Sequence, residues 1–158
     1  MIVTYDGTFP FIEDVRHRNF WIITEGGIIR WDTGQLTIPD WYGTDGASIP
    51  RLCWSILYPI DQRIRKAAVL HDRLYETHAQ DDDTPLSRWT ADLLLYAGMA
   101  PLGASPALRW AVWSAVRSGG QAAWMTGPGR RIARQQIVAR VRKAELVDFV
   151  TGAELERC

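Results

Sequence analysis

Apolar and polar positions change their spacing once along this chain. In the first third, the short apolar runs FWIIT, GIIRW and QLTIP are separated by Gly-Gly and Asp-Thr-Gly, which favour turns. These runs predict two to four short antiparallel strands within residues 1–50. From residue 50 onward, apolar residues recur roughly every three to four positions, the spacing of one face of an α-helix. Helices are predicted at residues 50–57, 61–78, 85–100, 106–124 and 129–150.

This pattern predicts an α+β fold that is mostly α. Short N-terminal antiparallel strands and a loop occupy residues 1–50, and a helical bundle follows over residues 51–158. With 158 residues, 47% of them hydrophobic, the chain is long enough to bury one ordinary core. We therefore expect a single domain over residues 1–158.

The apolar face of predicted helix 61–78 contains a histidine. One sector of its helical wheel collects the apolar side chains Ile64, Ala67, Ala68, Leu70, Leu74 and Tyr75. The charged side chains Arg65, Lys66, Arg73 and Glu76 lie roughly opposite. His71 lies in the middle of the apolar sector, and Asp72 lies at its edge. An ionisable group on an inward face needs a polar partner.

The next predicted helix, residues 85–100, carries Asp92 among apolar side chains. The simplest arrangement that satisfies both groups is an antiparallel helix pair in which His71 bonds Asp92. The alternative is an ion pair between Arg88 and Asp92 at i, i+4 spacing, with His71 bonded to a backbone carbonyl. Spacing alone does not decide between the two.

A glycine-rich segment, WYGTDGASIPRLCW, joins the last predicted strand to the first predicted helix. It offers the Asp45 carboxylate and exposed backbone carbonyls such as that of Gly43, and these are ligands that calcium prefers. If this loop folds against His71 and Asp72, then Asp45 and Asp72 could share a cation. The alternative is an Asx turn at Asp45, with Ser48 as the N-cap of the helix that follows.

Charge and cysteine content restrict the function classes. The formal net charge is zero, so general duplex binding is not indicated and no nucleic-acid partner is expected. The two cysteines, Cys53 and Cys158, do not make a disulfide framework or a cysteine metal site. The sequence shows no signal peptide and no membrane span. We therefore expect synthesis as a soluble cytoplasmic protein.

Two stretches near the C-terminus allow two interpretations each. Helix 106–124 places Trp110, Trp113, Arg117, Gly120 and Trp124 in one sector. This sector could be a membrane-facing strip or an acyl pocket. More often such a sector is core or an oligomer contact, in which Arg117 stacks on a tryptophan and pairs with an acid.

The last predicted helix is basic. Its cationic side chains are Arg130, Arg131, Arg134, Arg140, Arg142 and Lys143. They could bind anionic lipid headgroups or nucleic acid, or they could form a solvated face with Ile132, Val138 and Val141 turned inward. His17 and His78 are interpreted as surface residues without a role.

The segments TDGAS and AAVLHDRLY, followed by Asp92 in the next helix, resemble the catalytic core of the phospholipase A2 superfamily, in particular its bacterial and fungal branch. The resemblance implies a phospholipase A2-like antiparallel helix pair with His71 as general base and Asp92 as its orienting partner. It further implies Asp45 and Asp72 as calcium ligands and Tyr75 as a hydrogen-bond donor to the buried carboxylate. Ala47 occupies the position where that branch has a cysteine.

A second resemblance covers more of the chain. The segments IPDWYGTDGASIPR, KAAVLHDRLY, RWTADLLL and WAVWSAVRSGG are similar to a family of small uncharacterised proteins encoded in bacteriophage and prophage genomes. This likeness extends over about residues 20–124 and implies a viral setting without a reaction.

Three functions follow as hypotheses. The first is a calcium-dependent lipid esterase of phospholipase A2 type, in which the His71–Asp92 dyad activates water and a phospholipid or membrane surface is the partner. The second is a non-catalytic component of the phage tail or neck that stays in the virion, contacts other virion proteins and can form a homo-oligomer. The third is another metal-dependent hydrolase that acts on cell wall or phosphodiesters.

Overall fold

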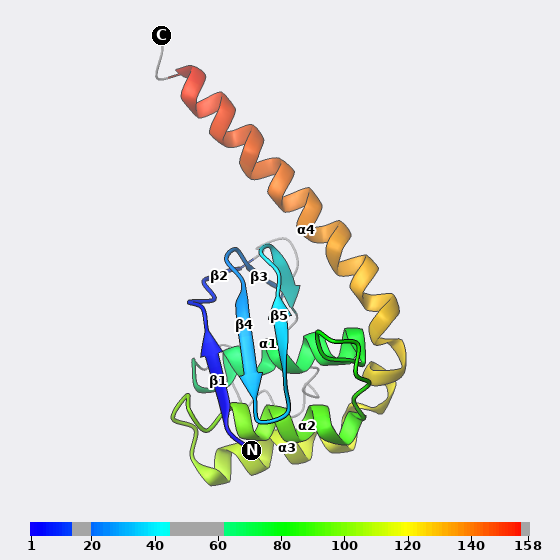
Figure 1. Ribbon diagram of the computed structural model, residues 1–158. Helices are drawn as coiled ribbons and strands as arrows, with labels where there is room; N and C mark the ends of the chain where they lie inside the picture. Colours follow the sequence, from blue (N-terminus) through cyan, green and yellow to red (C-terminus); the bar gives the residue numbers. More distant parts are fainter. Residues whose placement is uncertain (14–19, 45–61, 156–158) are drawn as a thin grey trace.

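The computed structural model describes residues 1–13, 20–44 and 62–155, with side chains up to residue 143 (Figure 1). The strands in this part of the chain are β1 Val3–Asp6, β2 Phe11–Glu13, β3 Trp21–Ile23, β4 Gly27–Trp31, β5 Gly34–Ile38 and β6 Tyr42–Thr44. The helices are α1 Gln62–Thr77, α2 Arg88–Gly98, α3 Pro106–Gly119 and α4 Gln121–Leu155. The fold is α+β and mostly α, as the sequence predicts.

The strands form two small antiparallel sheets, with orders β1-β4-β5 and β2-β3-β6. The hairpin β4–β5 pairs Trp31 with Gly34 at its turn, as the Asp-Thr-Gly sequence predicts. The described residues form six strands, more than the two to four expected, because β1, β2 and β6 are only three or four residues long and give weak sequence signals.

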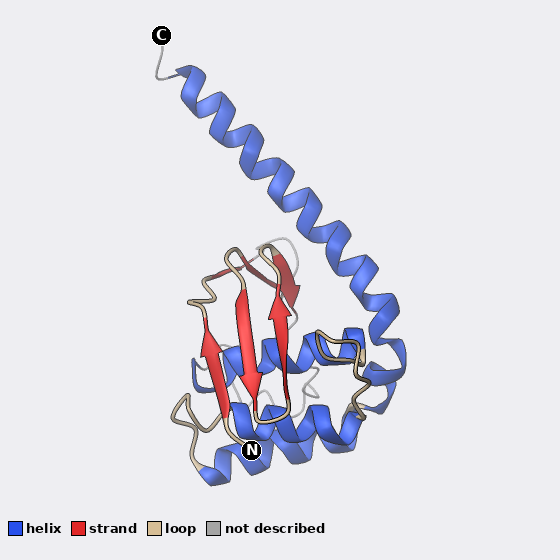
Figure 2. Cartoon of the chain, in the orientation of Figure 1, coloured by secondary structure: helices blue, strands red, loops and turns tan. Residues whose placement is uncertain are grey.

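The main core lies between the first sheet and helices α1 and α2 (Figure 2). Ile29 and Leu36 of the sheet share this apolar cluster with Leu70 and Leu74 of α1 and Leu94 of α2. A second cluster joins the other faces of α1 and α2 to Val112 and Val116 of α3. Helices α1 and α2 are therefore covered on two sides, which explains why a polar group between them is cut off from water.

Helices α1 and α2 run antiparallel, as predicted. His71 contacts Asp92, while Ala67, one turn earlier, lies against Gly98. A Cβ at Gly98 would lie 2.6 Å from the Tyr5 hydroxyl, so glycine allows the helix to approach β1 closely. Tyr5 donates to the Gly98 carbonyl at 2.9 Å and fixes the end of α2 to the sheet.

Helix α2 begins later than the predicted residue 85. Pro85 forms an isolated β-bridge with Ala79, and the Ser87 side chain caps the helix by accepting from the Thr90 amide. The predicted helix 50–57 lies outside the described residues.

The break between the last two helices lies at a different position from the predicted one. The sequence suggested that one helix ends at residue 124 and another begins at residue 129, whereas α3 ends at Gly119 and α4 continues through Pro128. The break falls at Gly120, where a Cβ would lie 2.8 Å from the Tyr75 hydroxyl. The C-terminal half of α4 extends away from the rest of the molecule (Figure 1). None of the helices in the described ranges combines the length and the apolarity needed to cross a bilayer.

Candidate functional site

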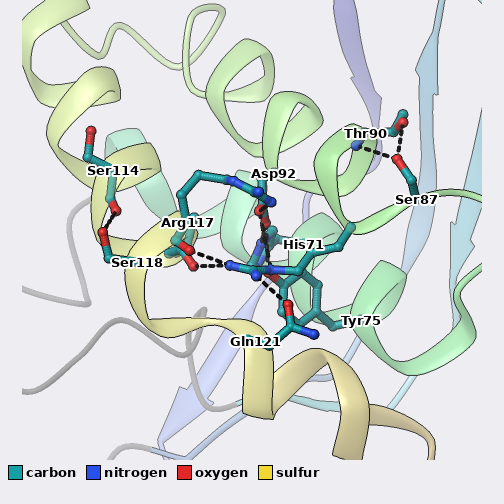
Figure 3. Close-up of polar contacts among 11 residues, drawn as sticks. His71, Tyr75, Ser87, Thr90, Asp92, Ser114, Arg117, Ser118 and Gln121 are labelled. Atoms are coloured by element: carbon teal, nitrogen blue, oxygen red, sulfur yellow. Dashed lines mark hydrogen bonds and ion pairs between the residues drawn. The ribbon is translucent and has the colours of Figure 1, made fainter.

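The site is centred on a buried histidine–aspartate pair. His71 Nε2 lies 2.7 Å from Asp92 Oδ1, and the exposed fractions of the two side chains are 1% and 0% (Figure 3). Both residues come from the inward faces of adjacent antiparallel helices, which is where the sequence placed them. The predicted contact is confirmed.

Asp92 also accepts hydrogen bonds from two other side chains, Tyr75 of α1 and Arg117 of α3. The Tyr75 hydroxyl donates to Oδ1 at 2.7 Å, and Arg117 Nη1 of α3 donates to Oδ2 at 2.8 Å. Arg88 Nε lies 3.6 Å from Oδ2, so the predicted i, i+4 ion pair exists beside the His71 contact and does not replace it. Figure 3 shows the side chains of His71, Tyr75 and Arg117 gathered around Asp92.

These contacts set the ionisation of the cluster. Burial by itself raises the pKa of Asp92, but the hydrogen bonds from His71, Tyr75 and Arg117 outweigh burial and hold this pKa below its ordinary value. Burial, together with the bond to the Asp92 carboxylate, raises the pKa of the Tyr75 phenol. At neutral pH, Asp92 is therefore an anion and Tyr75 a neutral donor.

Arg88 and Arg117 hold the third helix against this carboxylate. Arg88 Nη2 donates to the Val116 carbonyl at 3.0 Å, near the C-terminus of α3, where this carbonyl also accepts from the Gly120 amide at 2.7 Å. The Arg117 guanidinium lies over the Trp89 ring at 5.0 Å from its centroid. The prediction that Arg117 stacks on a tryptophan and pairs with an acid is confirmed.

The second ring nitrogen of His71 has no hydrogen-bond partner among the described residues, although it is buried. An Asp92 carboxylate can only accept, so Nε2 carries the proton in this contact and a neutral ring leaves its lone pair on Nδ1. This arrangement is the one a general base requires.

Asp72 lies on the neighbouring face of α1 with a different set of partners. It accepts from the Thr44 hydroxyl of β6, and Arg134 Nη2 lies 3.8 Å away. Glu76, one turn later, accepts from Arg134 Nη1 at 2.6 Å. The sequence predicts Glu76 on a charged face of its helix and Arg134 among the basic side chains of the last helix, yet both are buried. The one feature of the sequence that could have indicated this contact is the pair of acids, Asp72 and Glu76, one helical turn apart.

Only part of the predicted calcium site, Gly43 and Asp72, lies within the described residues. Arg134 already supplies positive charge at Asp72, and the described residues contain no cluster of three or more groups able to ligate a metal. Gly43 lies in β6, where a Cβ would overlap the side chains of Phe20 and Val138, so close packing explains the glycine. Asp45 and Ser48 lie outside the described residues. Calcium therefore stays a prediction.

Three expectations about the remaining side chains need correction. His78 is half-buried and bonded to Trp124, so it is not a free surface residue. Trp124 belongs to α4, which separates it from the sector of Trp110 on α3. On α4, Val138 is buried and Val141 half-buried, whereas Ile132 is 61% exposed.

The fold and the site define a small α+β protein in which a buried His–Asp pair joins two antiparallel helices. Residues 21–116, more than half of the chain, match a family described as a protein of unknown function, DUF1353. The chain belongs to this family. No curated protein and no solved structure matches it.

Proposed function

We propose that this protein is a lipid esterase of phospholipase A2 type in which His71 activates a water molecule. The observation that carries the proposal is the pairing of His71 Nε2 with Asp92 while Nδ1 has no partner among the described residues. The sequence resemblance to the phospholipase A2 core supports the same residues in the same roles. The resemblance of the chain to phage-encoded proteins supports action of the esterase in the virion or at host lysis.

In this proposal, His71 Nδ1 takes a proton from water as the water oxygen bonds to the ester carbonyl carbon. The ester C–O bond then breaks, and the imidazolium returns its proton to the departing alcohol. Asp92 holds the ring and stabilises the imidazolium, while Tyr75 and Arg117 hold the carboxylate.

A non-catalytic virion component is the second candidate. Asp92 is fully buried and is bonded by side chains from α1 and α3, so the cluster joins three helices. An anion enclosed in this way would also serve as a purely structural connection.

The experiment that separates these candidates measures fatty-acid release from mixed phospholipid vesicles, with calcium or with a chelator. The decisive variant is His71→Gln, whose amide can still donate to Asp92 but cannot act as a base. The matched control is His78→Gln, the same substitution at a histidine outside the His71–Asp92 cluster.

Release by the wild type and by His78→Gln, with loss in His71→Gln, supports the esterase. Absence of release from every lipid, with or without calcium, contradicts it and favours the structural candidate. Equal release by the wild type and His71→Gln also contradicts it, because the base would then lie elsewhere.

A further inference from the structure

A groove of about 610 Å³ lies between the β5–β6 connection, α1 and α4. We call it the α4 groove; Trp41, Tyr42, Arg73, Glu76, Arg134 and Arg142 are among its lining residues. Its volume is in the range of pockets that hold small molecules. It opens on the Asp72–Glu76 face of α1 and is distinct from the His71–Asp92 site.

The α4 groove carries an excess of positive charge. Five cationic side chains line it, against two carboxylates: Arg73, Arg131, Arg134, Arg142 and Lys143, against Asp40 and Glu76. Both carboxylates have partners of their own. Asp40 accepts from the Gly26 amide at 2.8 Å, and Glu76 accepts from Arg134 at 2.6 Å. The groove therefore attracts anions.

Three buried polar atoms of the groove-lining residues have no hydrogen-bond partner among the described residues: Tyr42 Oη, Arg73 Nε and Glu76 Oε2. Glu76 Oε2 has Arg73 Nη1 at ion-pair distance, 3.8 Å. A buried polar atom without a partner is costly, so such atoms gathered in one pocket point to a missing ligand. Two of the three are donors, and the Glu76 oxygen is an acceptor. The complementary ligand accepts at two points and donates at one.

Trp41 and Arg142 form one wall of the groove. The Arg142 guanidinium lies over the Trp41 ring, 5.6 Å from its centroid. Trp41 adopts φ of +56°, a conformation that a bulky residue rarely takes and that often accompanies a functional constraint. Stacking on the indole restricts the Arg142 side chain, which lowers the entropy lost when it binds an anion.

We propose that the α4 groove binds a phosphate ester that carries a hydroxyl group, such as a glycerophosphate. Phosphate oxygens accept from Tyr42, Arg73 and Arg142, for which arginine is well suited. The ligand hydroxyl donates to Glu76 Oε2. This binding goes beyond the proposed esterase and does not rest on it, because none of these residues belongs to the His71–Asp92 cluster.

The test is calorimetric titration of the whole protein with glycerol 3-phosphate and with inorganic phosphate. A parallel arm measures co-sedimentation with phosphatidylcholine vesicles that contain or lack phosphatidylglycerol. The test variant is Arg142→Gln. The matched control is Arg140→Gln, which removes the same charge from an exposed position of α4 that does not line the groove.

We expect Arg142→Gln to weaken binding about tenfold, the loss of one charge-assisted contact, while Arg140→Gln changes it by less than about twofold. Binding of glycerol 3-phosphate identifies a free ester as the ligand, and binding only of phosphatidylglycerol vesicles identifies a lipid headgroup. Equal losses in the two variants would reduce the effect to the general charge of α4 and overturn the proposal. The proposal would also be overturned if neither glycerol 3-phosphate nor the phosphatidylglycerol vesicles bound. Binding of inorganic phosphate as tightly as glycerol 3-phosphate would overturn it too. The His71→Gln variant should bind normally, which separates this test from that of the esterase.

Discussion

His78 donates from Nε2 to the backbone carbonyl of Trp124 at 3.0 Å, and the two rings stack with centroids 3.9 Å apart. In an α-helix this carbonyl accepts from the amide four residues later, which here is Pro128 and has no N–H. His78 therefore replaces the hydrogen bond that proline removes. This contact helps to explain why α4 continues through Pro128.

The first prediction concerns this replacement. His78→Ala leaves the Trp124 carbonyl without its partner and should lower the free energy of unfolding by roughly 1–3 kcal/mol. Adding Pro128→Ala should restore part of the loss, because the substituted alanine would supply the missing amide. Urea unfolding of both single variants and the double variant measures the coupling. Additive effects would show that His78 does not serve this carbonyl.

Two glycines on α4 give a second prediction. A Cβ at Gly127 would overlap the carbonyl of Tyr75, whereas a Cβ at Gly129 meets nothing within 4 Å. Gly127→Ala should therefore push α4 away from α1 and cost roughly 1–3 kcal/mol. Gly129→Ala should stabilise the protein by roughly 0.5–1 kcal/mol, since alanine favours helix more than glycine. Thermal melts of the pair check the packing directly, and similar shifts in both would contradict it.

The third prediction follows from the ionisation of Asp92. Its pKa in the folded protein lies below the ordinary value of 3.8, so its contribution to stability is present above that value and is lost as pH falls through the folded-state pKa. Asp92→Asn should cost about 3–5 kcal/mol at neutral pH, because it leaves the partly buried Arg88 and Arg117 without a carboxylate.

The measurement is the free energy of unfolding of the wild type and of Asp92→Asn, from neutral pH to below 3.8. The difference between them should narrow as pH falls below about 3.8, because the unfolded chain then binds a proton at Asp92 that the folded protein binds only at lower pH. Asp83→Asn at an exposed position is the control and should leave the pH dependence nearly unchanged. A difference that stays constant with pH would show that Asp92 is not ionised in the folded state.

The fourth prediction separates the fold from the chemistry at His71. His71→Gln should keep the unfolding free energy within about 1 kcal/mol, because the glutamine amide can donate to Asp92. His71→Ala should cost roughly 2–3 kcal/mol, since it removes the donor and leaves a cavity. Thermal melts rank the two variants. A glutamine variant as unstable as the alanine variant would make loss of activity uninformative, and Tyr75→Phe would then be the milder probe of the cluster.

Much of the local structure could be predicted because its signals lie within a few residues of each other. The turns at Gly26–Gly27 and Asp32–Gly34 delimit β3, β4 and β5, and apolar spacing gives α1 and most of α2. His71 and Asp92 could be paired from sequence for the same reason: each is a polar group on an otherwise apolar helix face, and two such faces must satisfy each other.

The sequence by itself thus determined which helix faces turn inward and that His71, Asp92 and Arg117 needed polar partners. Only the tertiary structure decided which partners they have. Arg134 of α4 meets Asp72 and Glu76 of α1, and His78 meets Trp124, through contacts between elements far apart in the chain. The local rule that Gly-Pro-Gly ends a helix fails at residues 127–129, since Gly127 packs on α1 and His78 bonds the carbonyl that Pro128 leaves open. Helical periodicity reflects neighbours within a turn, whereas the partner of a buried charge depends on how distant elements pack together.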